Sequence, residues 1–224
     1  MSATPLVSRF VMTSGVSPGI GKSTVTSGLA RRAGAAGLDA QLLNVDQIFS
    51  RLEFAAIGRA FRDRTYPTAE MMLRGYARLA SALGRTGAVI FDWSCLGMVS
   101  DLPWAEGRPD VLLQHARDVF ELTRPLRPVL LVLVGDIEVA VARAAKERGE
   151  RWVRRYAGLA AMDGAATRTR LAAIADWIRG QPYETLELHA FRTAGWPVWE
   201  IDAMRPPSDV LEDAAARLGI PMAS

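Results

Sequence analysis

One stretch of the chain combines glycines, a lysine and hydroxyl side chains at the spacing that phosphate binding requires. Its Lys22 is one of only two lysines in a chain whose other cationic residues are arginines. Glycines let the backbone approach an anion closely, and N–H groups at a helix N-terminus point toward phosphate oxygens. The lysine would reach the terminal phosphates, and the hydroxyl of Ser23 would bind Mg²⁺. The predicted nucleotide contacts are Gly15, Ser17, Gly19, Ile20, Gly21, Lys22, Ser23 and Thr24.

Two aspartates follow short apolar runs and are the candidate partners of this stretch. Asp92 ends the run 88–91, and Asp46 follows the run 40–45. Because ligands of open parallel sheets bind at the carboxyl ends of the strands, we expect both carboxylates to face the phosphates. Asp92 would bind Mg²⁺ together with Ser23, or accept a proton. Asp46 would act as general base on an acceptor hydroxyl, or cap the helix that follows.

The elements that would position these residues alternate between short apolar runs and longer amphipathic segments. Expected strands are Arg9–Thr13, Ala40–Val45, Ala88–Asp92, Val129–Val134 and Val198–Ile201. Expected helices are Ser23–Ala36, Phe49–Arg62, Thr68–Leu83, Asp110–Thr123, Ile137–Arg148, Ala165–Arg179, Tyr183–Thr193 and Ser208–Leu218. This order predicts a three-layer α/β fold with a five-stranded parallel sheet. We expect one domain, 1–224, with a helical lid within 143–182.

The glycine-rich stretch resembles the Walker A motif of P-loop nucleoside-triphosphate-binding proteins, and Ala88–Asp92 resembles a Walker B strand. The first glycine of the usual motif would fall on Val16, whereas Gly15 stands one position earlier. Either the loop is one residue longer than usual, or it tolerates valine. The resemblance implies the P-loop fold, with ATP and Mg²⁺ bound.

Two further segments resemble small-molecule P-loop kinases such as uridine kinase and nicotinamide riboside kinase. The stretch from Asp46 to Phe49 is similar to the segment after their second strand, where an aspartate contacts or deprotonates the acceptor hydroxyl. The run 136–155 is similar to their arginine-bearing lid helix. Within it, other arginines have a glutamate four residues away and would form surface ion pairs. The arginines without such a partner, Arg148 and Arg155, are therefore the predicted lid contacts to the triphosphate.

The acceptor site is expected between the second and third strands, the region that covers the acceptor in such kinases. Candidate side chains are Asp46, Phe49, Glu53, Arg59, Arg62, Tyr66 and Trp93. Arginines and aromatic rings together suit an anionic or ring-bearing acceptor. Helix-face arginines are also commonly just solvated, and this alternative stays open. The loop 202–208 occupies the position at which related kinases place a loop beneath adenine.

Composition excludes several classes. Half of the 224 residues are hydrophobic and the formal charge is +3, with arginines and acidic residues interleaved, so neither disorder nor nucleic-acid binding is expected. One cysteine provides no disulfide framework. No apolar run reaches the roughly 20 residues of a membrane span, and no signal-type segment is evident. We therefore expect a cytoplasmic protein with no membrane partner.

These patterns predict an ATP-dependent kinase that transfers the γ-phosphoryl group to a hydroxyl of a nucleoside-like or secondary-metabolite acceptor, antibiotics included. A nucleoside monophosphate kinase is one alternative. The stretch from Met12 to Asp46 also resembles the opening of ParA/MinD-type ATPases, although their additional lysine is replaced by Val16 and Ser17. A switch ATPase acting on a protein partner is therefore a second alternative. The sequence leaves open the acceptor, the choice between ATP and GTP, and a homodimer.

Overall fold

A five-stranded parallel sheet lies at the centre of the computed structural model, which describes residues 6–48, 50–160, 167–180 and 183–221. The sheet order is β2-β3-β1-β4-β5. The strands are β1 (Phe10–Gly15), β2 (Ala40–Leu43), β3 (Ala88–Phe91), β4 (Pro128–Val134) and β5 (Val198–Asp202). Every neighbouring pair is parallel, so the predicted α/β fold with a five-stranded parallel sheet is confirmed.

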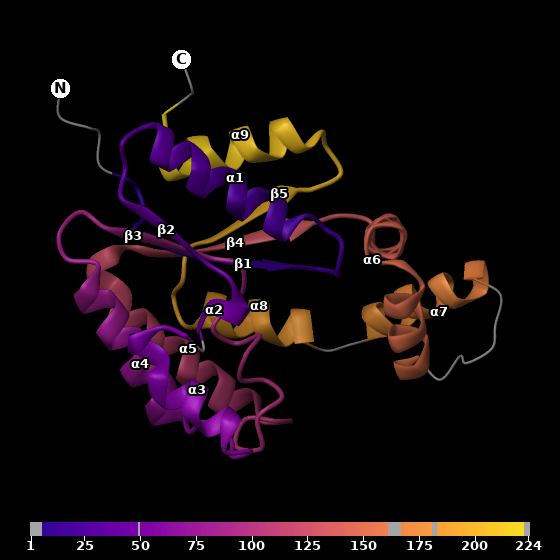
Figure 1. Ribbon diagram of the computed structural model, residues 1–224, viewed down its shortest axis with the longest axis horizontal. Coiled ribbons are helices and arrows are strands. Elements are labelled where there is room, and N and C mark those ends of the chain that lie inside the picture. Colours follow the sequence, from indigo (N-terminus) through magenta and orange to yellow (C-terminus); the bar gives the residue numbers. More distant parts are fainter. Residues whose placement is uncertain (1–5, 49, 161–166, 181–182, 222–224) are drawn as a thin grey trace.

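Helices cover both faces of this sheet and produce three layers (Figure 1). One face carries α1 (Lys22–Ala35) and α9 (Pro207–Leu218). The other carries α4 (Ala69–Ala82), α5 (Pro109–Thr123) and α8 (Tyr183–Thr193). Side chains of β1 alternate between the two layers, because successive residues of a strand point to opposite faces. Phe10 and Met12 belong to the core beneath α4 and α5, whereas Val11 belongs to the core beneath α1.

The middle position of β1 determines where a ligand can bind. It pairs with β3 on one side and with β4 on the other, and the pairing with β4 runs from Phe10↔Pro128 to Gly15↔Leu133. The loop after β1 therefore begins at the centre of the sheet's carboxyl edge, between the ends of β3 and β4. This edge is the usual ligand site of open α/β sheets.

The segment after β2 differs from the single helix expected at Phe49–Arg62. It contains α2 (Val45–Ile48), a 3₁₀ helix η1 (Leu52–Phe54) and α3 (Ala55–Arg62). Arg51 interrupts the helical path because its backbone is extended, with φ −79° and ψ 142°. Its guanidinium is tied to Glu53 at 2.7 Å and to the side-chain oxygen of Gln41 in β2 at 3.1 Å. The same arginine therefore anchors the segment to the edge strand.

The helix expected at Ile137–Arg148 is longer than predicted. As α6 it runs from Ile137 to Leu159, with a break at Gly149, where φ is 75° and ψ is −172°. Both halves of α6 pack against α7 (Thr167–Gly180) through a separate hydrophobic cluster, which includes Val141, Trp152 and Ile174. In Figure 1 these two helices stand beside the sheet rather than over one of its faces.

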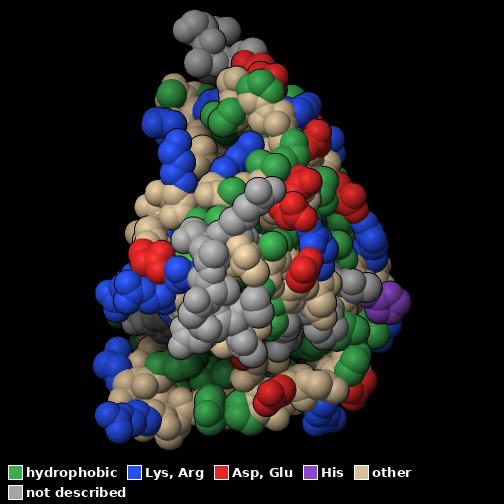
Figure 2. All heavy atoms as spheres, turned by 90° about the vertical axis from the view of Figure 1, so that its right-hand side faces the viewer, with side chains coloured by type: hydrophobic (Ala, Val, Ile, Leu, Met, Phe, Trp, Pro, Cys, Tyr) green, Lys and Arg blue, Asp and Glu red, His purple; other side chains and the backbone are tan. Residues whose placement is uncertain are grey.

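The surface around α6 and α7 carries charges of both signs. Figure 2 shows acidic and basic side chains interleaved over this face, with basic side chains along one edge. A short 3₁₀ helix, η2 (Arg124–Leu126), completes the described elements. No helix within the described ranges is both long enough and apolar enough to cross a membrane.

Candidate active site

The glycine-rich stretch forms the loop between β1 and α1. Gly19 and Gly21 both adopt left-handed backbone conformations, with φ of 81° and 105°. A Cβ added to Gly19 would lie 2.2 Å from the carbonyl oxygen of Ala140, so this loop packs directly against the first turns of α6. Gly21 precedes α1, and no side chain caps that helix end. The first-turn N–H groups have no intrahelical partner and remain available to an anion.

The path of the loop explains how it accommodates Val16. Gly15 lies opposite Leu133 in the sheet, and the N–H of Val16 still donates to the Leu133 carbonyl at 3.2 Å. A Cβ on Gly15 would come within 2.7 Å of the Cγ2 atom of Ile20, so glycine is required there for packing. Val16 instead packs against the core under α1. Gly15 therefore still belongs to β1, and the loop that follows it accommodates Val16.

A hydroxyl and a carboxylate meet beside this loop, as predicted for a magnesium site. Ser23 Oγ donates a hydrogen bond of 2.8 Å to Asp92 Oδ2. Asp92 Oδ1 is buried and has no hydrogen-bond partner among the described residues. Burial raises the pKa of the Asp92 carboxyl, and the Ser23 hydrogen bond and the charges of Lys22 and Arg148 oppose that rise. A hydroxyl with an unpartnered carboxylate oxygen fits Mg²⁺, which keeps several waters and phosphate oxygens as its other ligands.

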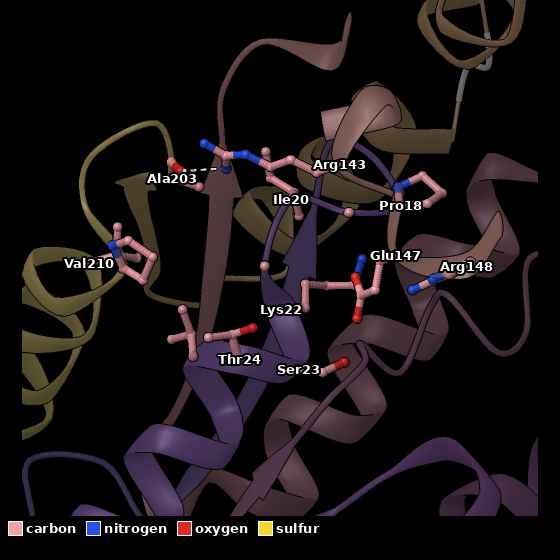
Figure 3. A pocket seen from close by; sticks show the side chains of 14 residues that line it. Pro18, Ile20, Lys22, Ser23, Thr24, Arg143, Glu147, Arg148, Ala203 and Val210 are labelled. Atoms are coloured by element: carbon pink, nitrogen blue, oxygen red, sulfur yellow. Dashed lines mark hydrogen bonds between the residues drawn. The ribbon is translucent and has the colours of Figure 1, made fainter. Parts of the chain in front are cut away.

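A cavity of about 370 Å³ opens beside the loop, within the size range of small-molecule pockets. Figure 3 shows the side chains that line it, which come from three regions of the chain. Its lining includes Ile20, Lys22, Ser23 and Thr24 of the loop and α1, Arg143, Glu147 and Arg148 of α6, and Ala203, Pro207 and Val210 around the start of α9. The loop 202–208, expected beneath the nucleobase, therefore does border the pocket.

Two arginines of α6 enter this pocket, and only one of them was predicted. Arg148 lines it and lies near enough to Asp92 to influence that carboxylate. Arg143 was expected to pair with Glu147, but its guanidinium instead donates to the Ala203 carbonyl at 3.4 Å (Figure 3). A planar guanidinium in that position is suited to stack on a nucleobase. Arg155 is exposed and does not line the cavity.

The expected ion pairs of α6 are realised at one position in the described part of the chain. Glu150 accepts from Arg154 at 3.3 Å, four residues on, and also from Arg170 of α7 at 2.8 Å. This acidic residue follows the break at Gly149 directly. It therefore connects the second half of α6 to α7.

The side chains expected to bind the acceptor belong to the segment after β2, except Trp93, which follows β3. Glu53 forms an ion pair with Arg51. Arg59, Arg62 and Tyr66 are exposed to solvent. Trp93 is buried and packs edge-on against Phe91, with ring centroids 4.9 Å apart. None of these five residues lines the cavity beside the loop.

The remaining two acceptor candidates cannot be placed as side chains. Phe49 and the side chain of Asp46 lie outside the described residues. The backbone of Asp46 lies within α2, directly after β2. Asp46 therefore lies inside a short helix and is not the N-cap residue of the longer helix that was expected after it.

A carboxylate that sequence reasoning missed lies under the carboxyl edge of the sheet. Glu187 of α8 accepts hydrogen bonds from Ser14 Oγ, at 3.2 Å, and from Ser94 Oγ. Burial raises the pKa of its carboxyl, while these two hydrogen bonds and the charge of Lys22 oppose the rise. Along the chain it is one glutamate in an amphipathic helix, and no local motif marks it.

Comparisons with known proteins gave matches among solved structures. No protein-family model and no curated protein matches the chain. Among solved structures it is similar to an unliganded sugar kinase from a Janibacter species, with 18% identity over 95% of both chains and a TM-score of 0.46. It is also similar to a gluconokinase from Sinorhizobium meliloti, with 16% identity over 94% of this chain and 91% of that one and a TM-score of 0.42.

Proposed function

We propose that this protein is a small-molecule kinase that binds MgATP and transfers the γ-phosphoryl group to a hydroxyl of a small acceptor. One observation carries the proposal. The glycine loop places Lys22 at the N-terminus of α1, next to the hydrogen-bonded pair of Ser23 and Asp92, and Arg148 reaches the same place from α6. Phosphoryl transfer needs positioning and charge stabilisation more than covalent chemistry, and this set supplies both.

Each part of the pocket has a role in this proposal. The loop N–H groups and Lys22 hold the β- and γ-phosphates. The nucleobase occupies the end of the cavity bordered by Arg143, Ala203 and Pro207. Mg²⁺ would be held by Ser23 and Asp92 and would offset the charge of the phosphate oxygens.

The helical lid predicted within 143–182 completes the site in this proposal. The part of α6 after Gly149, which Glu150 ties to α7, would close over the triphosphate, with Arg148 directly before the break. Closure excludes water, which otherwise competes with the acceptor for the phosphoryl group. Asp46 stays a candidate for contacting the acceptor hydroxyl, because its backbone follows β2 at the sheet's carboxyl edge.

The proposal is tested by ADP release from MgATP, first alone and then with pools of hydroxylated metabolites, with products identified by mass. We expect negligible ADP release without an acceptor and a product heavier by one phosphoryl group with one pool. Lys22→Ala removes this activity. Lys146→Ala is the matched control, because it removes the chain's other lysine, which is exposed on α6.

The result that contradicts the proposal is slow ADP release that no pool accelerates, with no phosphorylated product. A switch ATPase would behave in this way until its protein partner is added.

A further inference from the structure

The buried carboxylate of Glu187 occupies a position from which it can serve the proposed transfer. Ser14 is the next-to-last residue of β1, just before the glycine loop, and Ser94 stands two residues after Asp92. Both hydroxyls donate to Glu187, which is half-buried on α8 with its carboxylate turned inward. The charge of Lys22 acts on both Glu187 and Asp92. The sheet edge therefore holds two carboxylates around one lysine, and the magnesium site uses only one of them.

A second cavity, of about 230 Å³, opens beside Glu187. Its other walls are Leu96, Gly97, Ser100, Asp101, Leu112 and Leu186. Among the described residues, neither a lysine nor an arginine lines it. The cavity thus combines apolar walls with one hydroxyl and two carboxylates.

We propose that this cavity is the acceptor site and that Glu187 accepts the proton of the acceptor hydroxyl, which deepens the proposed function and rests on it. The acceptor oxygen forms its bond to the γ-phosphorus as the bond from that phosphorus to the β–γ bridging oxygen breaks. The electron pair of the broken bond stays on ADP, and the hydroxyl proton passes to Glu187 and then to solvent.

The surroundings of Glu187 suit a general base. Ser14 and Ser94 each donate to a different carboxylate oxygen, so the group is held in one orientation and keeps lone pairs for a further donor. Ser94 Oγ is itself fixed, because it accepts from the N–H of Gly97 at 2.9 Å. Burial raises the pKa of the carboxyl, and a base with a raised pKa takes a proton more readily than an ordinary carboxylate.

The lining also defines the class of acceptor. Two carboxylates repel an anionic ligand and accept hydrogen bonds from hydroxyl or ammonium groups, so the acceptor carries no phosphate or carboxylate. The cavity volume of about 230 Å³ suits a compact molecule of monosaccharide size. The inferred acceptor is therefore a compact polyhydroxylated molecule, neutral or amine-bearing. This differs from the anionic acceptor expected from Arg59 and Arg62.

The first arm of the test compares four groups of probes as acceptors for MgATP. They are neutral sugars and polyols such as glucose and inositol, amino sugars such as glucosamine, sugar acids such as gluconate, and nucleoside monophosphates. We expect phosphorylated product only with the first two groups.

The second arm uses variants with the acceptor that the first arm identifies. Glu187→Gln keeps the side-chain volume and should lower kcat at least about 100-fold while leaving MgATP affinity within about threefold. Ser100→Phe fills the cavity while keeping the Glu187 carboxylate in the protein, and it should raise the KM for the acceptor at least about tenfold. Glu121→Gln, on the exposed end of α5, is the matched carboxylate control and should match the unmodified protein. Thermal melts of each variant confirm that it is folded.

The outcomes separate this inference from the proposed function. Transfer to a neutral or amino sugar that Glu187→Gln abolishes supports both. Transfer only to sugar acids or nucleotides, or a Glu187→Gln variant that retains kcat within about threefold, overturns the acceptor assignment and leaves the kinase standing. Loss of transfer in Asp46→Asn with Glu187→Gln unaffected has the same meaning and moves the base to Asp46. MgATP binding without transfer to any probe group overturns the proposed function and the acceptor site with it.

Discussion

Ser23 Oγ lies 2.8 Å from Asp92 Oδ2 and donates a hydrogen bond to it, although the two residues are 69 positions apart in the chain. The sheet produces this meeting, because β3 is the direct neighbour of β1 and both strands end at the same edge. The other oxygen of Asp92 is buried without a partner in the described part of the chain. Such an oxygen is costly to leave unsatisfied, and a bound cation would satisfy it.

Asp92→Asn is predicted to lower phosphoryl transfer without lowering the stability of the fold. Because burial already disfavours the charged form of Asp92, removal of the charge should leave the free energy of unfolding within about 1 kcal/mol. Phosphoryl transfer should fall at least about 100-fold, and the Mg²⁺ concentration at half-maximal activity should rise. Denaturant titration and a magnesium series measure the two effects. Unchanged magnesium dependence would remove Asp92 from the metal site.

Gly19→Ala is predicted to destabilise the protein through the contact between the loop and α6. The added Cβ would lie 2.2 Å from the Ala140 carbonyl oxygen, in a residue whose φ is already 81°. Gly37→Ala is the matched control, since its φ is 72° and nothing lies within 4 Å of the added Cβ. Both variants carry backbone strain, but only Gly19→Ala adds a clash, so it should lose about 1–3 kcal/mol more in urea unfolding. Equal losses would show that the loop does not pack on α6.

The sheet and the glycine-rich loop could be predicted because local patterns specify them. Strands buried on both faces appear as continuous apolar runs, and all five were located to within two residues at each end. The loop could be found because glycines and a lysine at fixed spacing have few other uses. Asp92 could be found because the end of a parallel strand has a fixed place relative to its neighbour.

The parts that sequence reasoning missed depend on contacts between distant segments. Glu187 is 173 residues from Ser14 and 93 from Ser94, so no local pattern relates them. Arg143 has a glutamate four residues away, which favoured a surface ion pair, yet the fold brings the Ala203 carbonyl within its reach. Arg51 interrupts the helix expected at Phe49–Arg62, and its side chain donates to Gln41 of β2, ten residues earlier in the chain.

Arg148→Ala is predicted to lower kcat more than it lowers MgATP affinity, because its charge assists the γ-phosphoryl group as it leaves. We expect at least a tenfold fall in kcat, with the Kd for a non-hydrolysable ATP analogue within about threefold. Arg151→Ala is the matched control, since Arg151 is an exposed arginine of the same helix that does not line the pocket. Equal turnover in the two variants would exclude Arg148 from the transfer step.

The protein is also predicted to lose stability in mild acid because of His115. This residue is 3% exposed, neither ring nitrogen has a hydrogen-bond partner among the described residues, and its ring lies 5.7 Å from that of Trp104. Burial lowers its pKa to about 4, against only a small opposing effect of Asp118. In the unfolded chain a histidine has a pKa of about 6.5, so the unfolded state takes up the proton first as the pH falls.

The stabilisation due to neutral His115 is therefore complete above pH 6.5 and is lost progressively as the pH falls toward 4. At full effect the loss is about 3 kcal/mol of unfolding free energy. Urea titrations across this pH range should show a slope that His115→Leu removes. His189→Leu, which replaces the chain's other histidine at an exposed position, should keep it. If His115→Leu and the unmodified protein lose stability in parallel between pH 6.5 and 4, His115 does not titrate as its burial requires.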